Sequence, residues 1–216
     1  MTQPMNRNAR IPAIGSVAEE EGEFWVENPF SMPQIGENLS AYEKNRMYLN
    51  HDGTSFVEVS TLSAAAIDSD SRGIMTGDFN RDGKPDLLVS SIGGGPLRLF
   101  LNRFSDDNDW ITLDLEGTKS NALGIGARVV IEAGGRKIYR DMFPQNGYMG
   151  MQATELVIGL GQVDRIDSME IRWPSGEVTN LTNLPVNRRI TVNEGSSDPV
   201  IDDYADAQPA ESPDCP

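Results

Sequence analysis

Nine consecutive residues constrain the fold of this chain more than any other segment, and they read Asp78-Phe79-Asn80-Arg81-Asp82-Gly83-Lys84-Pro85-Asp86. Oxygen-bearing side chains stand at positions one, three, five and nine, and a glycine that permits a sharp turn stands at position six. Alternate residues of a tight loop can point inward together, and Ca²⁺ takes roughly six to eight oxygen ligands. The pattern predicts a calcium loop whose ligands are the side chains of Asp78, Asn80, Asp82 and Asp86 and the main-chain carbonyl of Lys84.

The loop differs from an EF-hand, which has a glutamate at position twelve and a helix on each side. Position twelve is Val89, inside the apolar, strand-like run 87–91, and Pro85 disfavours a helix that leaves the loop. We therefore expect a β-strand to begin at Asp86. The alternative is a polar turn without metal, which is disfavoured because three carboxylates packed this closely repel one another unless a cation lies between them.

The composition favours an all-β protein. The chain has 216 residues, with 21 glycines and 13 prolines, and few segments show a helical period of apolar residues. The length suits one large or two small domains. The net charge of −15 argues against nucleic-acid binding, which requires a basic surface, and the acidic excess is concentrated in residues 1–44 and 196–216.

The sequence shows no apolar run long enough for a transmembrane helix, and residues 1–10 lack the apolar core of a signal peptide. The chain is accordingly cytosolic, or has lost an export signal, or is a piece of a longer protein. Its one cysteine, Cys215, cannot form an internal disulfide, and its role is open.

Short alternating strands are predicted on both sides of the loop, at 45–50, 55–60, 71–77, 87–91 and 97–102. Two of them, 46–50 and 97–102, end on an asparagine about 52 residues apart. A period near 50 residues made of short strands is typical of β-propeller blades.

The polar run 105–109 marks the expected domain boundary. Beyond it, glycine-punctuated strands are predicted at 110–115, 127–132, 137–142, 156–160, 169–173 and 189–193, which suits a small β-sandwich or open barrel. We therefore expect an extended N-terminal arm at 1–44, a propeller repeat at 45–104, a second β domain at 105–195 and an acidic, disordered tail at 196–216.

Residues 77–89 resemble the FG-GAP/VCBS repeat of integrin-like β-propellers, in which an acidic loop between two strands of a blade binds Ca²⁺. Residues 110–194 resemble the ASPIC/UnbV domain of the cartilage acidic protein family through five pieces in order: Gly117-Thr118-Lys119-Ser120-Asn121, Gly124-Ile125-Gly126-Ala127-Arg128-Val129, Gly147-Tyr148, Gly159-Leu160-Gly161 and Trp173-Pro174-Ser175-Gly176. The resemblance implies partial propeller blades followed by a small sandwich or open barrel, and an extracellular, periplasmic or cell-surface location.

Family members carry around seven blades, whereas this chain shows one calcium loop and the end of one preceding blade. A lone blade leaves open sheet edges and an exposed apolar face. Either the chain is the C-terminal portion of a longer propeller, or other protein chains complete it in a hetero-complex.

The favoured function is a non-catalytic, calcium-binding structural or protein-interaction module, acting as a scaffold or accessory subunit of a larger exported or surface assembly. Catalysis has little support, because the chain has one histidine, one terminal cysteine and no Gly-x-Ser-x-Gly element. An accessory subunit of a biosynthetic enzyme stays an alternative.

A carbohydrate-binding or cell-adhesion module is the third hypothesis, since aromatic side chains could stack on a glycan: Trp25, Trp110, Trp173, Tyr139 and Tyr148. For Trp110 and Trp173 a place in the core of the second domain is the favoured interpretation.

Overall fold

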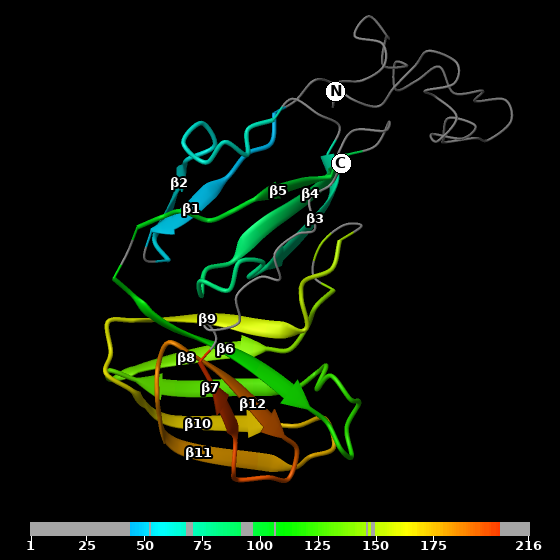
Figure 1. Ribbon diagram of the computed structural model, residues 1–216, viewed down its shortest axis with the longest axis vertical. Coiled ribbons are helices and arrows are strands. Elements are labelled where there is room, and N and C mark those ends of the chain that lie inside the picture. The colour runs from blue at the N-terminus through cyan, green and yellow to red at the C-terminus, as the bar shows by residue number, and fades with distance from the viewer. Residues whose placement is uncertain are drawn as a thin grey trace, which may run out of the picture. The chain divides into compact units, whose positions relative to one another are not determined.

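The computed structural model describes residues 44–51, 53–67, 71–91, 97–105, 107–145, 147 and 150–203 (Figure 1). Throughout these residues the regular elements are β-strands, which confirms the all-β prediction. Because they contain no helix, they also contain no apolar helix that could cross a membrane. The predicted N-terminal arm lies outside the described residues except for Lys44.

The described residues fall into two compact units. The first comprises those up to Ile74 together with Leu88–Phe100, and the second comprises Met75–Leu87 together with those from Leu101 onwards. The predicted calcium loop therefore belongs to the same compact unit as the C-terminal sheets.

Two small sheets carry the strands predicted for the propeller repeat. Strand β1 (Tyr48–His51) pairs antiparallel with β2 (Ser55–Glu58) in a two-stranded sheet. Strands β3 (Ser71–Gly77), β4 (Asp86–Ser91) and β5 (Arg98–Phe100) form a three-stranded sheet in that order. Neither sheet closes into a barrel, in agreement with the expectation of partial blades.

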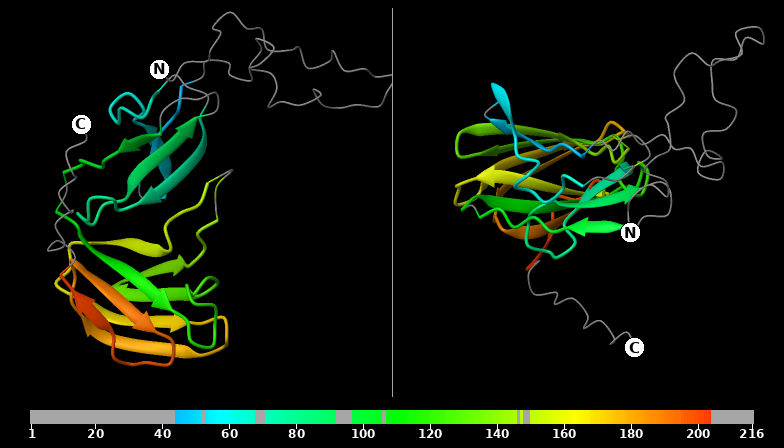
Figure 2. Two further views of the ribbon diagram at one scale, coloured as in Figure 1. Left: turned by 45° about the vertical axis from the view of Figure 1, so that its right-hand side comes forward. Right: turned by 90° about the horizontal axis from the view of Figure 1, so that it is seen from above.

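The remaining strands build a sandwich of two four-stranded sheets (Figures 1 and 2). One sheet has the order β11-β10-β7-β8, with β7 at Arg128–Ala133, β8 at Arg136–Asp141, β10 at Ile166–Arg172 and β11 at Val178–Leu184. The other has the order β13-β12-β6-β9, with β6 at Asp109–Glu116, β9 at Glu155–Gly161, β12 at Arg188–Asn193 and β13 at Val200–Asp202.

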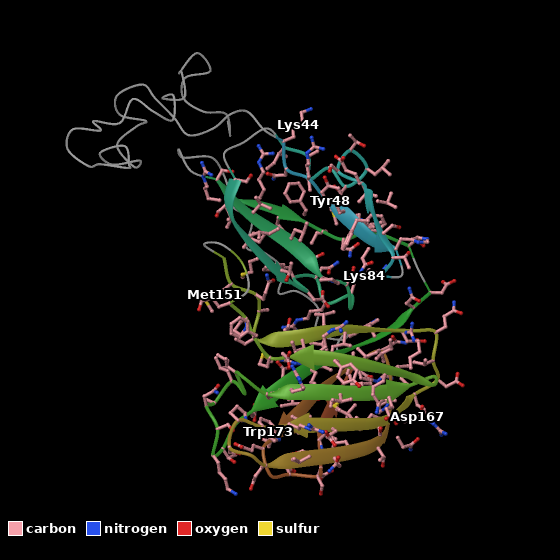
Figure 3. The ribbon with its side chains drawn as sticks, turned by 180° about the vertical axis from the view of Figure 1, so that it is seen from behind. Lys44, Tyr48, Lys84, Met151, Asp167 and Trp173 are labelled. Atoms are coloured by element: carbon pink, nitrogen blue, oxygen red, sulfur yellow. The ribbon has the colours of Figure 1, made fainter. Side chains whose placement is uncertain are left out.

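Alternating side chains of both sheets form one apolar core. Strand β6 contributes Ile111, Leu113 and Leu115, and β7 contributes Val129 and Ile131, all of them buried. Trp173, which follows β10, lies in the same core with 3% of its surface exposed (Figure 3). The period of two in these strands is what turns one face of each sheet inward.

Two strands of the sandwich were not predicted from the sequence. Strand β11 pairs with β10 along its length, and β13 pairs with β12. Strand β13 lies within residues 196–216, which were predicted to be a disordered tail, so this prediction is wrong for residues 196–203. Residues 204–216 lie outside the described part of the chain.

Candidate functional site

The predicted calcium loop joins β3 to β4. Strand β3 ends at Gly77, directly before the first predicted ligand, and β4 begins at Asp86, the last one, as the sequence predicted. Two residues of the loop have left-handed backbones, Arg81 with φ 60° and Gly83 with φ 82°. Gly83 suits such a turn because it carries no Cβ.

Two of the predicted ligands are buried carboxylates. Asp78 is 6% exposed and Asp86 is fully buried, whereas Asn80 and Asp82 lie at the surface. The Asp78 carboxylate accepts hydrogen bonds from the backbone N–H groups of Asp82 (3.1 Å) and Gly83 (2.7 Å), so its side chain shapes the turn from inside.

Asp86 holds the two ends of a longer segment together. Its Oδ2 accepts the Phe79 N–H (2.9 Å) and its Oδ1 accepts the Asn102 N–H (2.7 Å). The Asn102 side chain in turn donates to the Pro85 carbonyl (3.2 Å). The last predicted ligand is thus also the residue that ties the loop to the chain beyond β5.

The surface members of the loop are in mutual contact. Asp82 accepts the Lys84 N–H through Oδ1 (3.0 Å) and the Asn80 side-chain amide through Oδ2 (2.9 Å). The loop therefore brings Asp78, Asn80 and Asp82 close together through the Asp82 main chain and side chain. In the described part of the chain, no three acidic, histidine or cysteine side chains gather in a group that could hold a metal ion.

The surroundings of Asp78 disfavour the charged form of its carboxyl. Burial raises the pKa of the Asp78 carboxyl, the Asp82 charge raises it further, and the N–H bonds from Gly83 and Asp82 oppose the rise. A positive ion between the carboxylates would stabilise their charged forms. The oxygen-only donor set of Asp78, Asn80, Asp82, Asp86 and the Lys84 carbonyl fits the chemistry of Ca²⁺.

The loop also packs closely on its own unit. A Cβ added at Gly83 would lie 2.0 Å from the Trp110 indole, at the start of β6. The Lys84 ammonium group donates to the Phe104 carbonyl. At the end of β3, Thr76 donates its N–H to the Gln152 side chain (2.7 Å), and its carbonyl accepts the Ala153 N–H (3.2 Å).

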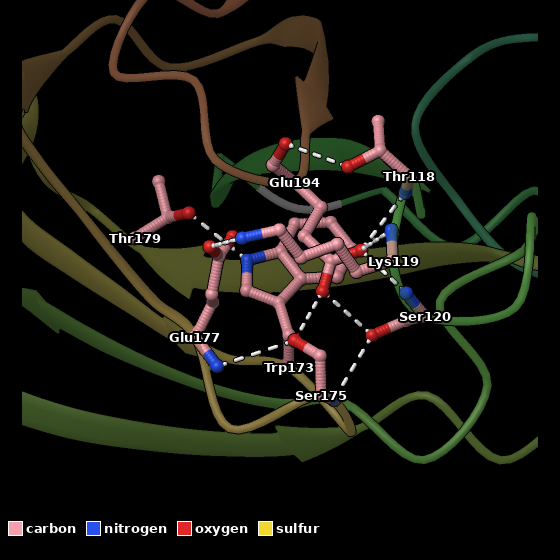
Figure 4. A network of polar contacts seen from close by, with 8 residues as sticks. All are labelled: Thr118, Lys119, Ser120, Trp173, Ser175, Glu177, Thr179 and Glu194. Carbon is pink, nitrogen blue, oxygen red and sulfur yellow. Dashed lines mark hydrogen bonds and ion pairs between the residues drawn. The ribbon is translucent and has the colours of Figure 1, made fainter.

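A second polar centre, which sequence reasoning missed, surrounds the carboxylate of Glu194 (Figure 4). Glu194 is 5% exposed and follows directly after β12. Its Oε2 accepts three successive backbone N–H groups, from Thr118 (2.8 Å), Lys119 (2.7 Å) and Ser120 (2.7 Å). Its Oε1 accepts the hydroxyl groups of Ser120 (2.7 Å) and Ser175.

These contacts decide the ionisation of Glu194. Burial by itself raises the pKa of a carboxyl, but the hydrogen bonds from Ser120, Ser175 and the Lys119 N–H outweigh it and hold the pKa of Glu194 far below its usual range. Beside it, Lys119 pairs with Glu177. The centre is a fully bonded carboxylate that joins three distant segments, which is a structural role.

Comparison with known families matches two parts of the chain. Residues 38–89 match the FG-GAP-like repeat, and residues 117–199 match the family described as ASPIC and UnbV. The chain carries an FG-GAP-like repeat and an ASPIC and UnbV domain. Both assignments confirm the resemblances read from the sequence.

The FG-GAP-like match covers β1 to β3, the predicted calcium loop and most of β4. Cartilage acidic protein 1 of Xenopus tropicalis is 28% identical over 142 residues, which is 62% of this chain. The chain spans only 22% of the length of that relative.

The ASPIC and UnbV domain places its sequence pieces around the Glu194 centre. The 117–121 piece supplies the three N–H groups, and the 173–176 piece supplies the Ser175 hydroxyl. Within the first piece, the Asn121 side chain exchanges hydrogen bonds with the main chain of Ile125 (2.7 and 2.8 Å). Glu194 directly follows the strand predicted at 189–193 and lies within the family match, and these two facts could have pointed to it as a functional or structural residue.

The aromatic residues that could stack on a glycan differ in how far they are exposed. Trp173 is buried and donates its indole N–H to the Thr179 hydroxyl (2.9 Å), so the core interpretation holds for it. Trp110 is half-buried beside Gly83 and lies outside the sandwich core, so the core interpretation is wrong for it. Tyr139 is 59% exposed, whereas Trp25 and Tyr148 lie outside the described residues.

Proposed function

We propose that this chain is a non-catalytic, calcium-stabilised module that holds protein partners in an exported or surface-exposed assembly. FG-GAP-like repeats and ASPIC and UnbV domains indicate a structural or protein-interaction role. The observation that carries the calcium part is the burial of Asp78 and Asp86 at the two ends of a nine-residue loop rich in oxygen ligands.

In this proposal the side chains of Asp78, Asn80, Asp82 and Asp86 and the Lys84 carbonyl hold Ca²⁺. The ion supplies positive charge that offsets the repulsion and desolvation of the loop carboxylates. Hydrogen bonds within the chain hold the loop conformation. Asp78 accepts the Asp82 and Gly83 N–H groups, and Asp86 accepts the Asn102 N–H.

The loop has the features of a structural site. All five proposed ligands come from one segment, and Gly83 is covered by Trp110. A loop bound in this way stabilises the strands at its ends, β3 and β4, and the start of β6 beside them. The chain has one histidine and one cysteine and no Gly-x-Ser-x-Gly element, so the common histidine-, cysteine- and serine-based catalytic arrangements have little support, which favours a non-catalytic role.

The partner proposal rests on the β1–β2 hairpin of the first unit. Leu49 pairs with Val57 on one face of this two-stranded sheet, and Tyr48 and Phe56 lie on the opposite face. All four are exposed, Phe56 by 70%. Because a sheet with two apolar faces needs cover on both sides, we propose that further propeller blades or other protein chains supply it.

Calorimetry with and without Ca²⁺ tests the calcium proposal. A ligand present at a hundred times its Kd stabilises the folded state by about 2.7 kcal/mol, which corresponds to a melting-temperature rise of roughly 5–10 °C for a chain of this size. Excess EGTA should reverse the rise. Asp78→Asn should abolish the calcium response, whereas Asp164→Asn, an exposed aspartate of the same unit, should leave it intact.

An EGTA-insensitive melting transition in the unaltered chain would contradict the calcium proposal. The partner proposal is tested separately by native mass determination after gentle purification from the source cells. Recovery of a stable, well-folded monomer without associated chains would overturn it.

A further inference from the structure

The outer face of the β11-β10-β7-β8 sheet carries a regular array of side chains that the proposed function does not use. Strand pairing aligns Tyr139 with Val130, Val130 with Glu170, and Glu170 with Asn180. Paired residues point to the same face of a sheet, so these four form one row across all four strands. With strands spaced about 4.8 Å apart, the row spans roughly 14 Å.

Two further rows flank the first. On one side the pairing gives Lys137, Glu132, Ser168 and Thr182, and on the other it gives Asp141, Arg128, Arg172 and Val178. A hollow of about 290 Å³ lies over the middle of this array, lined among others by Tyr139, Glu170, Asn180 and Thr182. The hollow thus has walls from all four strands.

The aromatic ring is the first feature that selects a ligand. Tyr139 is 59% exposed on a face whose other side chains are mostly polar, and β8 is an edge strand of its sheet. Its neighbour across the pair is an aliphatic side chain, Val130, which is half-buried. An exposed aromatic ring beside hydrogen-bonding groups suits the C–H face and hydroxyl edge of a sugar ring.

The charges of the array are the second feature. Three ion pairs lie within it: Arg128 with Asp141 (2.7 Å), Lys137 with Glu132 (2.8 Å) and Arg172 with Glu170 (2.6 Å). Every charge is therefore matched, and the face as a whole is neutral. A neutral face with paired carboxylates does not attract an anionic polymer, whereas its carboxylate oxygens and the Asn180 amide can bond hydroxyl groups.

We propose that this face of the ASPIC and UnbV domain binds a neutral oligosaccharide, which stacks on Tyr139 and hydrogen-bonds to Glu170 and Asn180. The site lies on the outer face of a sheet of the second domain and shares no residue with the calcium loop. It goes beyond the proposed structural role, because it gives the module a glycan ligand in addition to protein partners.

The test uses the full chain with Ca²⁺ present. An array of neutral and anionic oligosaccharides, followed by titration calorimetry with cellohexaose, xylohexaose and chitohexaose, should show binding to at least one neutral sugar. Tyr139→Ala should weaken that binding by about tenfold, which corresponds to about 1.4 kcal/mol, because the variant loses the stacked ring and the apolar surface that it buries. Asn180→Ala should weaken it as well.

Phe143→Ala is the matched control, because Phe143 is an aromatic residue of the same unit with nearly the same exposure, 58%. It should leave the affinity unchanged, and the melting temperatures of all variants check that they fold. The proposal is overturned if no neutral sugar binds, if anionic sugars bind more tightly than neutral ones, or if Tyr139→Ala has no larger effect than Phe143→Ala.

Discussion

The Ser120 amide donates a 2.7 Å hydrogen bond to the Glu194 carboxylate across 74 residues of sequence. This bond is one of several that the Glu194 carboxylate accepts. Together they join the turn after β6 and the turn after β10 to the end of β12. Because the carboxylate is nearly buried and every bond to it is made by an N–H or O–H group, its charge stabilises the sandwich only as long as all of these partners stay in place.

Glu194→Gln should destabilise the ASPIC and UnbV domain. A neutral amide brings an NH₂ group toward donors, so at least one buried N–H or hydroxyl loses its acceptor. We expect the melting temperature to fall by roughly 5–10 °C in thermal denaturation followed by circular dichroism. Glu116→Gln, a change at an exposed glutamate of β6, serves as the control, and an equal effect of both variants would contradict the role of Glu194.

The same carboxylate should make the domain sensitive to acid. Its folded-state pKa lies below the unfolded value of about 4.3, so the unfolded chain binds more protons at low pH. The stabilisation is therefore complete above about pH 5 and is lost progressively as the pH falls below about 4. Urea titrations at several pH values should show this loss, and Glu194→Gln should reduce the slope of stability against pH in that range.

Gly83→Ala should disrupt the proposed calcium loop more than a left-handed backbone alone explains. An alanine there meets both an unfavourable φ of 82° and the Trp110 ring. Gly135→Ala isolates the backbone effect, because φ is 72° and nothing lies within 4 Å of the added Cβ. We expect Gly135→Ala to lower the free energy of unfolding by about 1 kcal/mol, and Gly83→Ala to lower it by at least about 2 kcal/mol more, as measured by chemical denaturation. Equal costs would show that Trp110 does not restrict the loop.

Leu113→Ala should open a cavity in the core of the sandwich. Leu113 is fully buried in the middle of β6, between β12 and β9. Such a truncation costs about 2–5 kcal/mol. Leu123→Ala, at a leucine that is 47% exposed, should cost less than about 1 kcal/mol in the same denaturant titration. A small effect at Leu113 would argue against the packing of the two sheets.

Most of the strands could be predicted because their alternation of apolar and polar residues is local. The pattern of Ile111, Leu113 and Leu115 in β6 is an example, since the residues themselves show which face is buried. Strand β11 could not be found in this way. Its buried positions include Thr179, and Asn183 has a left-handed backbone (φ 55°) before the last buried residue, Leu184, so the apolar alternation is weak and irregular.

The candidate sites also differ in whether their residues are neighbours in the sequence. The proposed calcium ligands share one nine-residue segment, and the start of β4 at Asp86 followed from Pro85 and the apolar run after it. Tyr139 was visible as an aromatic residue, but its alignment with Val130, Glu170 and Asn180 depends on the register of three strand pairs. Register is specified by which faces are buried together, and that is a property of the assembled sheets.

The sequence by itself determined the all-β class and the two family regions, and it placed all the proposed calcium ligands in one loop, because each of these depends on residues that are neighbours along the chain. Only the tertiary structure decided that Gly83 packs on Trp110, that β12 runs parallel to β6, and that Glu194 is a buried anion. A glutamate before a glycine normally reads as a solvated surface residue. Its burial becomes favourable only when N–H and hydroxyl groups from segments far apart in the chain surround it, and no local pattern contains those partners.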